Sequence, residues 1–71
     1  MELTRMRRSR ALEAVGYDAA TARLRVRFRH GGTYDYLGVE PEVVEGLRAS
    51  AHPWTEWRER ILEHEVERVE T

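Results

Sequence analysis

The chain has 71 residues, enough for one small domain, and it lacks cysteine, which excludes disulfide bridges and thiolate metal ligands. Twelve arginines and thirteen acidic residues nearly cancel, so the net charge of −1 does not indicate a purely electrostatic nucleic-acid binder. No apolar run approaches the ~20 residues of a membrane span and the N-terminus turns polar at once, so we expect a cytoplasmic domain with no membrane partner.

The charges are distributed unevenly along the chain. Residues 1–30 hold eight arginines against three acidic residues, whereas residues 31–71 hold four arginines against ten acidic residues. The two halves can therefore pair within one fold or across a dimer, or present two surfaces of opposite sign.

The N-terminal third predicts an arm, a strand and a turn. Residues 1–11 are rich in arginine and poor in apolar side chains, which indicates a solvated basic arm before a single domain over residues 12–71. We expect the first strand over residues 12–17 and a turn over residues 18–21, where Asp18 can bond backbone donors two residues on.

Residues 22–29 alternate strictly between apolar residues and arginine, which predicts a half-buried strand. One face carries Leu24, Val26 and Phe28. The other face carries Arg23, Arg25, Arg27 and Arg29.

A hairpin should return the chain into a third strand over residues 33–37. A two-residue loop at residues 31–32 would place Asp35 on the apolar face, where an unpaired carboxylate is costly. A three-residue loop over residues 30–32 avoids this and joins aromatic residues across the apolar face, so we favour it. It pairs Phe28 with Tyr34, Val26 with Tyr36, and Arg27 with Asp35.

Two helices should follow. Pro41 between two glutamates suits a helix start, and this helix should end near residues 50–51. A second helix should open at Pro53 and continue to the end of the chain, because its apolar residues recur at helical spacing. We therefore expect an α+β domain, a three-stranded antiparallel β-meander followed by two α-helices.

Several elements together resemble the KTSC domain, named for the C-terminal region of some lysyl-tRNA synthetases. The resemblance covers roughly residues 9–61 and is carried by the Gly16-Tyr17-Asp18 element, the alternating strand, Gly31, the Tyr34-x-Tyr36 element and Val39. It implies the same small fold. The family's function is not established, and its synthetase context suggests RNA binding.

The sequence departs from the family pattern at four places. Only Ser9 remains of a serine pair before the first strand, and Pro41 comes one residue late. In the loop before the second helix, Trp57 stands where the family has Phe and Arg58 where it has Asn. A family activity residing in residues 52–58 would therefore be altered or lost here.

The arginines and tyrosines form the candidate site for RNA or tRNA. The arginine face can hold a phosphate backbone beside the arm, or can simply be the solvated face of a half-buried strand. The tyrosines can stack on bases, or can belong to the core. The candidate nucleic-acid-binding residues are Arg23, Arg25, Arg27, Arg29, Arg8, Arg10, Tyr34 and Tyr36.

The second helix suggests the alternative function, a protein-interaction or self-assembly module. One small sheet covers a second helix only in part, so we expect some of its apolar edge to meet another chain in a homodimer. The candidate interface residues are Trp57, Leu62, Val66 and Val69.

No pattern indicates an enzyme. The three histidines lack metal-site spacing, no glycine-rich phosphate loop is present, and no nucleophile or acid–base pair can be assigned. We therefore expect no catalytic residue, metal, cofactor or small-molecule substrate.

Overall fold

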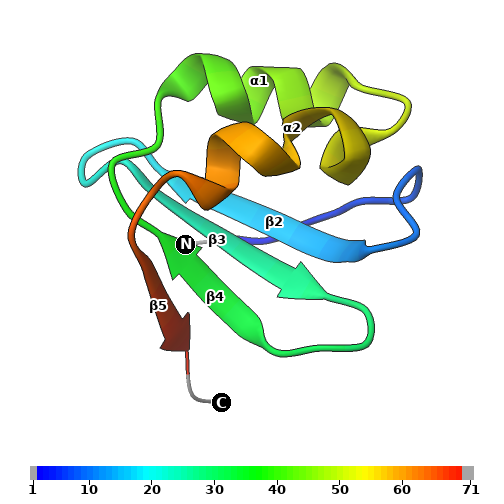
Figure 1. Ribbon diagram of the computed structural model, residues 1–71, viewed down its shortest axis with the longest axis horizontal. Helices are drawn as coiled ribbons and strands as arrows, with labels where there is room; N and C mark the ends of the chain where they lie inside the picture. Colours follow the sequence, from blue (N-terminus) through cyan, green and yellow to red (C-terminus); the bar gives the residue numbers. More distant parts are fainter. Residues whose placement is uncertain (1, 70–71) are drawn as a thin grey trace.

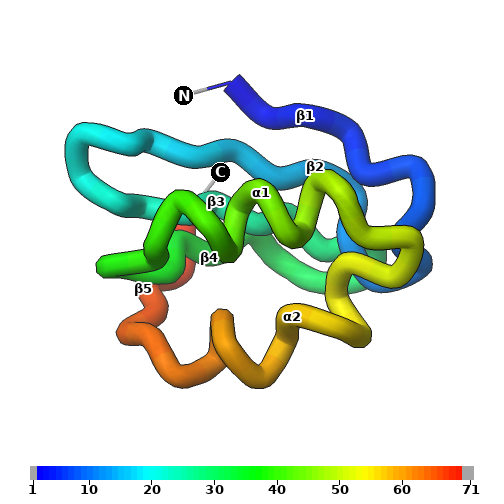
Figure 2. Tube along the Cα trace, turned by 90° about the horizontal axis from the view of Figure 1, so that it is seen from above, coloured from blue at the N-terminus to red at the C-terminus, as the bar shows by residue number. Residues whose placement is uncertain are grey.

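Two helices lie across one face of a five-stranded antiparallel sheet (Figures 1 and 2) in the computed structural model, which describes residues 2–69. The strands lie in the order of the sequence, so every neighbouring pair is antiparallel. The strands are β1 (Thr4–Arg5), β2 (Leu12–Asp18), β3 (Arg23–Phe28), β4 (Thr33–Tyr36) and β5 (Val66–Val69), and the helices are α1 (Pro41–Ala49) and α2 (Pro53–Leu62).

The core lies between the sheet and α1. Leu24 and Val26 of β3 point toward the helices, and their direct partners on β4, Tyr36 and Tyr34, share that face. The helices contribute three fully buried aliphatic side chains. These are Val43, Leu47 and Ile61.

Both helices begin at the predicted prolines. Pro41 and Pro53 occupy first-turn positions, where a missing N–H costs nothing. Helix α1 ends at Ala49 as expected, and α2 packs against it through Trp57, which covers Gly46 so closely that a Cβ there would collide with the indole ring. Gly46 is thus the position that lets the two helices approach.

The sheet has five strands, and the expected three-stranded meander was wrong at both ends. The arm adds β1, whose Thr4 and Arg5 pair with Val15 and Ala14. Helix α2 stops at Leu62, and β5 then returns beside β4 instead of continuing the helix. Without β5, the backbone groups along one side of β4 would be unpaired at the sheet edge. Pairing with β5 satisfies these groups, and this non-local interaction overrides the helical spacing of the sequence.

The hairpin has the predicted three-residue loop, but placed one residue earlier. The Phe28 N–H donates to the Gly32 carbonyl at 3.2 Å, which leaves residues 29–31 as the loop. The expected pairs were wrong by two positions: Arg25, not Arg27, faces Asp35, and Val26, not Phe28, faces Tyr34. A shift of two keeps every side chain on its face, so the predicted separation of aromatic and charged faces is confirmed.

No helix within residues 2–69 is both long and apolar enough to cross a membrane.

The contact between Gly46 and Trp57 gives the first prediction. Gly46→Ala should lower the free energy of unfolding by about 1–2 kcal/mol, because displacing the indole outweighs the better helix propensity of alanine. In a Trp57→Ala background the same substitution should instead stabilise by up to about 1 kcal/mol. Urea unfolding of the four proteins measures both, and destabilisation in both backgrounds would contradict the close approach.

Candidate nucleic-acid interface

The face of the sheet away from the helices carries a buried carboxylate held by two arginines. Asp35 on β4 is only 1% exposed although no helix within residues 2–69 covers this face. Arg25 Nε donates to its Oδ1 at 2.7 Å and Arg25 Nη2 to its Oδ2 at 3.0 Å. Arg23 Nη1 donates to the same Oδ2 at 3.0 Å and lies 3.5 Å from Glu67 of β5. Two of the predicted phosphate ligands are therefore neutralised within the fold.

This arrangement changes the acidity of the carboxyl. The hydrogen bond from Arg25 lowers the pKa of Asp35 below its ordinary 3.8, and the bond from Arg23 adds to it, while burial opposes both. The same contact raises the pKa of Arg25. The ionised pair is thus the stable state at neutral pH.

The other two arginines of the strand have different roles. Arg27 is 45% exposed, and its Nε lies 3.9 Å from Glu13, a distance too long for a strong ion pair. Arg29 turns away from the sheet face and donates to the backbone carbonyls of Ser9 and Met6, both at 3.0 Å. Arg29 therefore fastens the arm to the end of β3.

The predicted tyrosines separate into a core residue and a rim residue. Tyr36 is 4% exposed, and burial raises the pKa of its hydroxyl. Tyr34 is half-buried, with its ring centroid 5.9 Å from that of Phe28 in an edge-to-face contact. Tyr17 of β2 pairs with Leu24, the residue that also pairs with Tyr36, and it donates its hydroxyl to the Val39 carbonyl at 2.6 Å. Of the two candidate base-stacking tyrosines, only Tyr34 reaches the surface.

The basic arm is more ordered than its composition indicated. Met6 and Ser9 are buried, the Met6 N–H donates to the Glu13 carbonyl at 2.9 Å, and Ser9 Oγ accepts from the Leu12 N–H at 2.9 Å. The four arginine side chains of the arm, between and beside these anchors, are exposed. They line the same surface as the arginine at the end of α1. We call this group the arginine edge: Arg5, Arg7, Arg8, Arg10 and Arg48.

The arginine edge carries basic charge that no acidic side chain within residues 2–69 pairs with. Within residues 2–69, the ion pairs involve arginines 23, 25, 27 and 60 and none of the edge. Arg8 and Arg10 were among the predicted ligands, Arg5 and Arg7 belong to the basic arm predicted to lie beside them, and Arg48 was not predicted. Arg48 comes from 38 residues beyond Arg10, and only the tertiary structure places it there.

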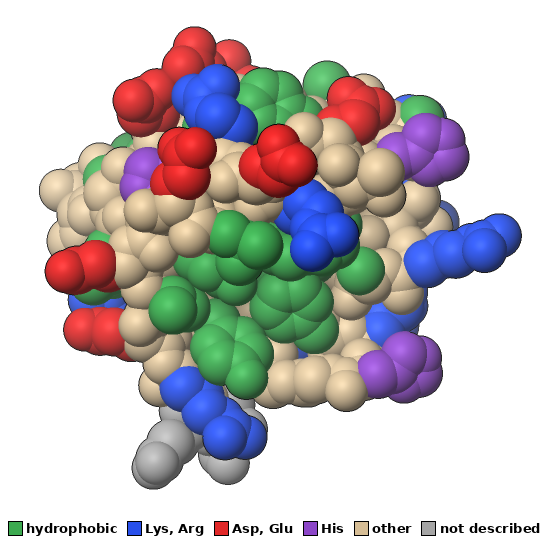
Figure 3. Space-filling model, viewed as in Figure 1, with side chains coloured by type: hydrophobic (Ala, Val, Ile, Leu, Met, Phe, Trp, Pro, Cys, Tyr) green, Lys and Arg blue, Asp and Glu red, His purple; other side chains and the backbone are tan. Residues whose placement is uncertain are grey.

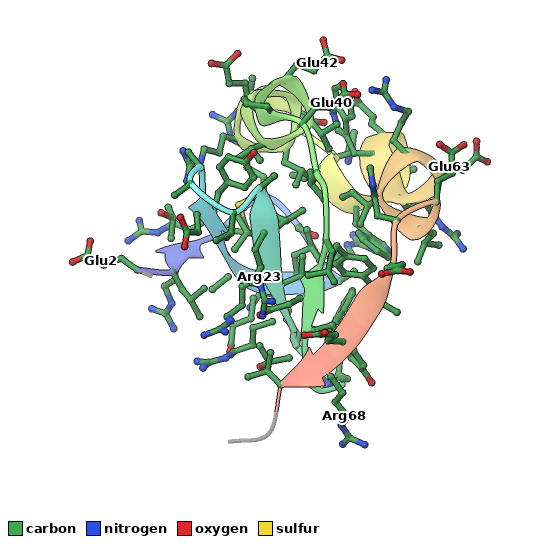
Figure 4. All side chains as sticks on the ribbon, turned by 90° about the vertical axis from the view of Figure 1, so that its left-hand side faces the viewer. Glu2, Arg23, Glu40, Glu42, Glu63 and Arg68 are labelled. Carbon is green, nitrogen blue, oxygen red and sulfur yellow. The ribbon has the colours of Figure 1, made fainter. Side chains whose placement is uncertain are left out.

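The acidic charge gathers at the far end of the helices. Figure 4 shows Glu40 and Glu42 beside each other at the start of α1, and Glu63 at the end of the neighbouring helix α2. Arg60 lies between them and the Trp57 ring, 3.3 Å from Glu42 and 3.6 Å from Glu40. The near-neutral chain thus has an acidic end opposite its arginine edge.

The four predicted interface residues do not share one helix stripe. Trp57 packs on α1, and Leu62 and Val66 are 52% and 51% exposed on either side of the turn from α2 to β5. Val69 pairs with Thr33 and lies on the opposite face of the sheet from Val66. Leu62 and Val66 are therefore the two exposed members of the four, and we call these two side chains the exposed patch.

No group of three or more histidine, cysteine or acidic side chains within residues 2–69 is arranged to hold a metal ion.

Comparison with known proteins identifies close counterparts of this fold. The sequence model of the KTSC domain matches residues 8–63. The crystal structure of a KTSC domain protein from Yersinia pestis superposes with a TM-score of 0.86 over 97% of both chains, at 20% sequence identity. A protein of Tsukamurella paurometabola is 50% identical over 42 residues, which cover 59% of this chain and 63% of that protein, less than two thirds of its length.

The buried carboxylate predicts how stability depends on pH. Because Asp35 binds a proton less readily in the native than in the unfolded state, stability should be lost as the pH falls from about 5 through 3.8 toward its lowered native pKa. Asp35→Asn should lower the free energy of unfolding by about 1–2 kcal/mol at neutral pH. Its free energy of unfolding should then fall less than that of the wild type when the pH is lowered.

Urea midpoints between neutral pH and about pH 3 measure this difference. Glu59→Gln removes an exposed carboxyl of α2 and is the control that should follow the wild type. Parallel pH profiles for wild type and Asp35→Asn would show that the carboxyl is not held as described.

Proposed function

The chain belongs to the KTSC domain family, and from that premise we propose that it is a small non-enzymatic binding module that holds the phosphate backbone of RNA on its arginine edge. The family match defines the fold, and the function is inferred from this chain's own charges. The supporting observation is the cluster of five arginines with no ion pair within residues 2–69.

Arginine is suited to this contact by its shape. The planar guanidinium offers several donors in a fork that matches phosphate oxygens, and it is charged at every physiological pH. A flexible arm would lose conformational freedom on binding, but here Arg29 and Ser9 already hold residues 6–12 in place. The backbone that carries the edge arginines is therefore ordered before an extended anion binds.

The sheet face is a weaker candidate than the sequence indicated. A phosphate would have to compete with Asp35 for Arg25 and Arg23, which are bonded to it at 2.7–3.0 Å. Displacing them would leave a buried carboxylate without its partners, at a cost of several kcal/mol. Arg27 makes only a long contact, at 3.9 Å from Glu13.

Salt dependence gives a direct test with a short oligouridine strand. Arg7→Ala and Arg8→Ala change exposed turn residues whose side chains make no hydrogen bond within the described residues 2–69. Each should weaken binding and lower the slope of log affinity against log salt by about 0.7, and together by about 1.4, because each arginine neutralises one phosphate.

Arg60→Ala is the matched control, since it removes the same charge where Glu40 and Glu42 already neutralise it. Its salt slope should equal that of the wild type. Absence of binding at low salt, or an unchanged slope in the double variant, would refute the arginine edge as an RNA site.

A second candidate function, self-assembly, is favoured by the exposed patch of Leu62 and Val66. The free edge of β5 is poorly suited to extending the sheet in a symmetric dimer. Antiparallel pairing of two copies centred on Glu67 or on Arg68 would place each of those residues opposite its own like charge. A dimer would therefore form through the side chains of the patch.

Sedimentation at increasing concentration tests this candidate. If the patch mediates a dimer, Val66→Asp should dissociate it by placing a charge in an apolar contact, whereas Thr55→Asp, at an exposed polar position of α2, should not. A wild-type protein that stays monomeric at high concentration would eliminate this function.

A further inference from the structure

Trp54 differs from Trp57 in what surrounds it. Trp57 lies against Gly46, with the Arg60 guanidinium 5.8 Å from its ring centroid. Trp54 is half-buried, and the Phe28 ring holds it in an edge-to-face contact at 5.1 Å and 82°. An aromatic ring that is fixed in orientation and still reaches the surface can serve as a stacking surface.

The exposed part of Trp54 faces a hollow that joins the arginine edge. The hollow has a volume of about 370 Å³. Its lining includes Arg8 and Arg10 of the edge and Ser9 between them, with Trp54, His52 and Thr55 on the opposite side. Arg8 also lines the neighbouring hollow with Arg7 and Arg48, so the two hollows are continuous with one charged surface.

Beyond Trp54, the apolar surface continues toward a further arginine. Phe28 contacts Tyr34, and Arg68 lies beside Tyr34 as its direct partner on β5. Figure 3 shows this apolar surface in the middle of one face, between α2 and the strands, with basic side chains above and below it. Cationic groups therefore flank the aromatic rings at both ends, as in surfaces that bind a single strand of nucleic acid.

We infer that, if the proposed RNA contact is right, its ligand is single-stranded and one of its bases stacks on Trp54 while Arg8 and Arg10 hold the adjoining phosphates. In a duplex the bases are stacked on each other and paired, so none can enter a hollow beside a half-buried ring. An unpaired strand can turn a base inward and keep its phosphates on the edge. Stacking tolerates any base, so no sequence preference is required.

The two tryptophans allow the contact to be observed directly. Trp57→Phe leaves Trp54 as the sole indole, and Trp54→Phe leaves Trp57, so each variant reports on one ring. Titration with a short oligouridine strand should quench the fluorescence of Trp54 to saturation and leave that of Trp57 unchanged. An RNA duplex of equal phosphate number should not quench Trp54. Trp54→Leu should weaken binding of the single strand about tenfold.

The outcomes separate this inference from the function on which it depends. Binding that follows the arginine edge, with no quenching of Trp54 or with equal affinity for the duplex, would overturn the stacking contact and leave the phosphate contact standing. No binding of either RNA would overturn both. Circular dichroism of Trp54→Leu checks its fold, and the phenylalanine variants decide the matter if that variant unfolds.

Discussion

Two guanidinium groups close over the Asp35 carboxylate on the side of the sheet away from the helices, and the remaining surface chemistry follows from this contact. A carboxylate at this depth is tolerated because Arg25 and Arg23 supply three hydrogen bonds to it. Facing Arg25 also fixes the register of the β3–β4 hairpin. The most regular charge pattern in the sequence is therefore mainly structural, and the arginines left for a ligand lie elsewhere.

The fold converts an uneven sequence into a molecule with two ends of opposite charge. Helices α1 and α2 place Glu40, Glu42 and Glu63 at one end, and the start of α2, the end of α1 and the arm meet at the other. Arg29 secures the arm by donating hydrogen bonds to two of its carbonyls. Arg29, predicted as a ligand, therefore positions the arginines of the edge. A net charge near zero conceals both ends.

The sequence allowed the alternating strand, the helix starts at Pro41 and Pro53 and the separation of charged from aromatic faces to be predicted, because each depends on local periodicity or backbone chemistry. The predictions that were wrong or missing depend on interactions between residues far apart in the sequence. Val66 and Val69 fit the apolar stripe of a helix, but they lie in a strand because this segment pairs with the open edge of β4. Registers that differ by two residues present the same faces, so pattern alone cannot separate them. The proximity of Arg48 to the arm has no local signal.

We expect Arg23 and Arg25 to remain bound to Asp35 when RNA binds to the arginine edge. Arginine side-chain Nε–H resonances, followed by NMR during titration with oligouridine, distinguish the two groups in one experiment. The resonances of Arg7, Arg8 and Arg10 should shift progressively, and those of Arg23 and Arg25 should keep their positions. Shifts confined to Arg23 and Arg25, with none in the arm, would show that RNA binds to the sheet face and not to the arginine edge.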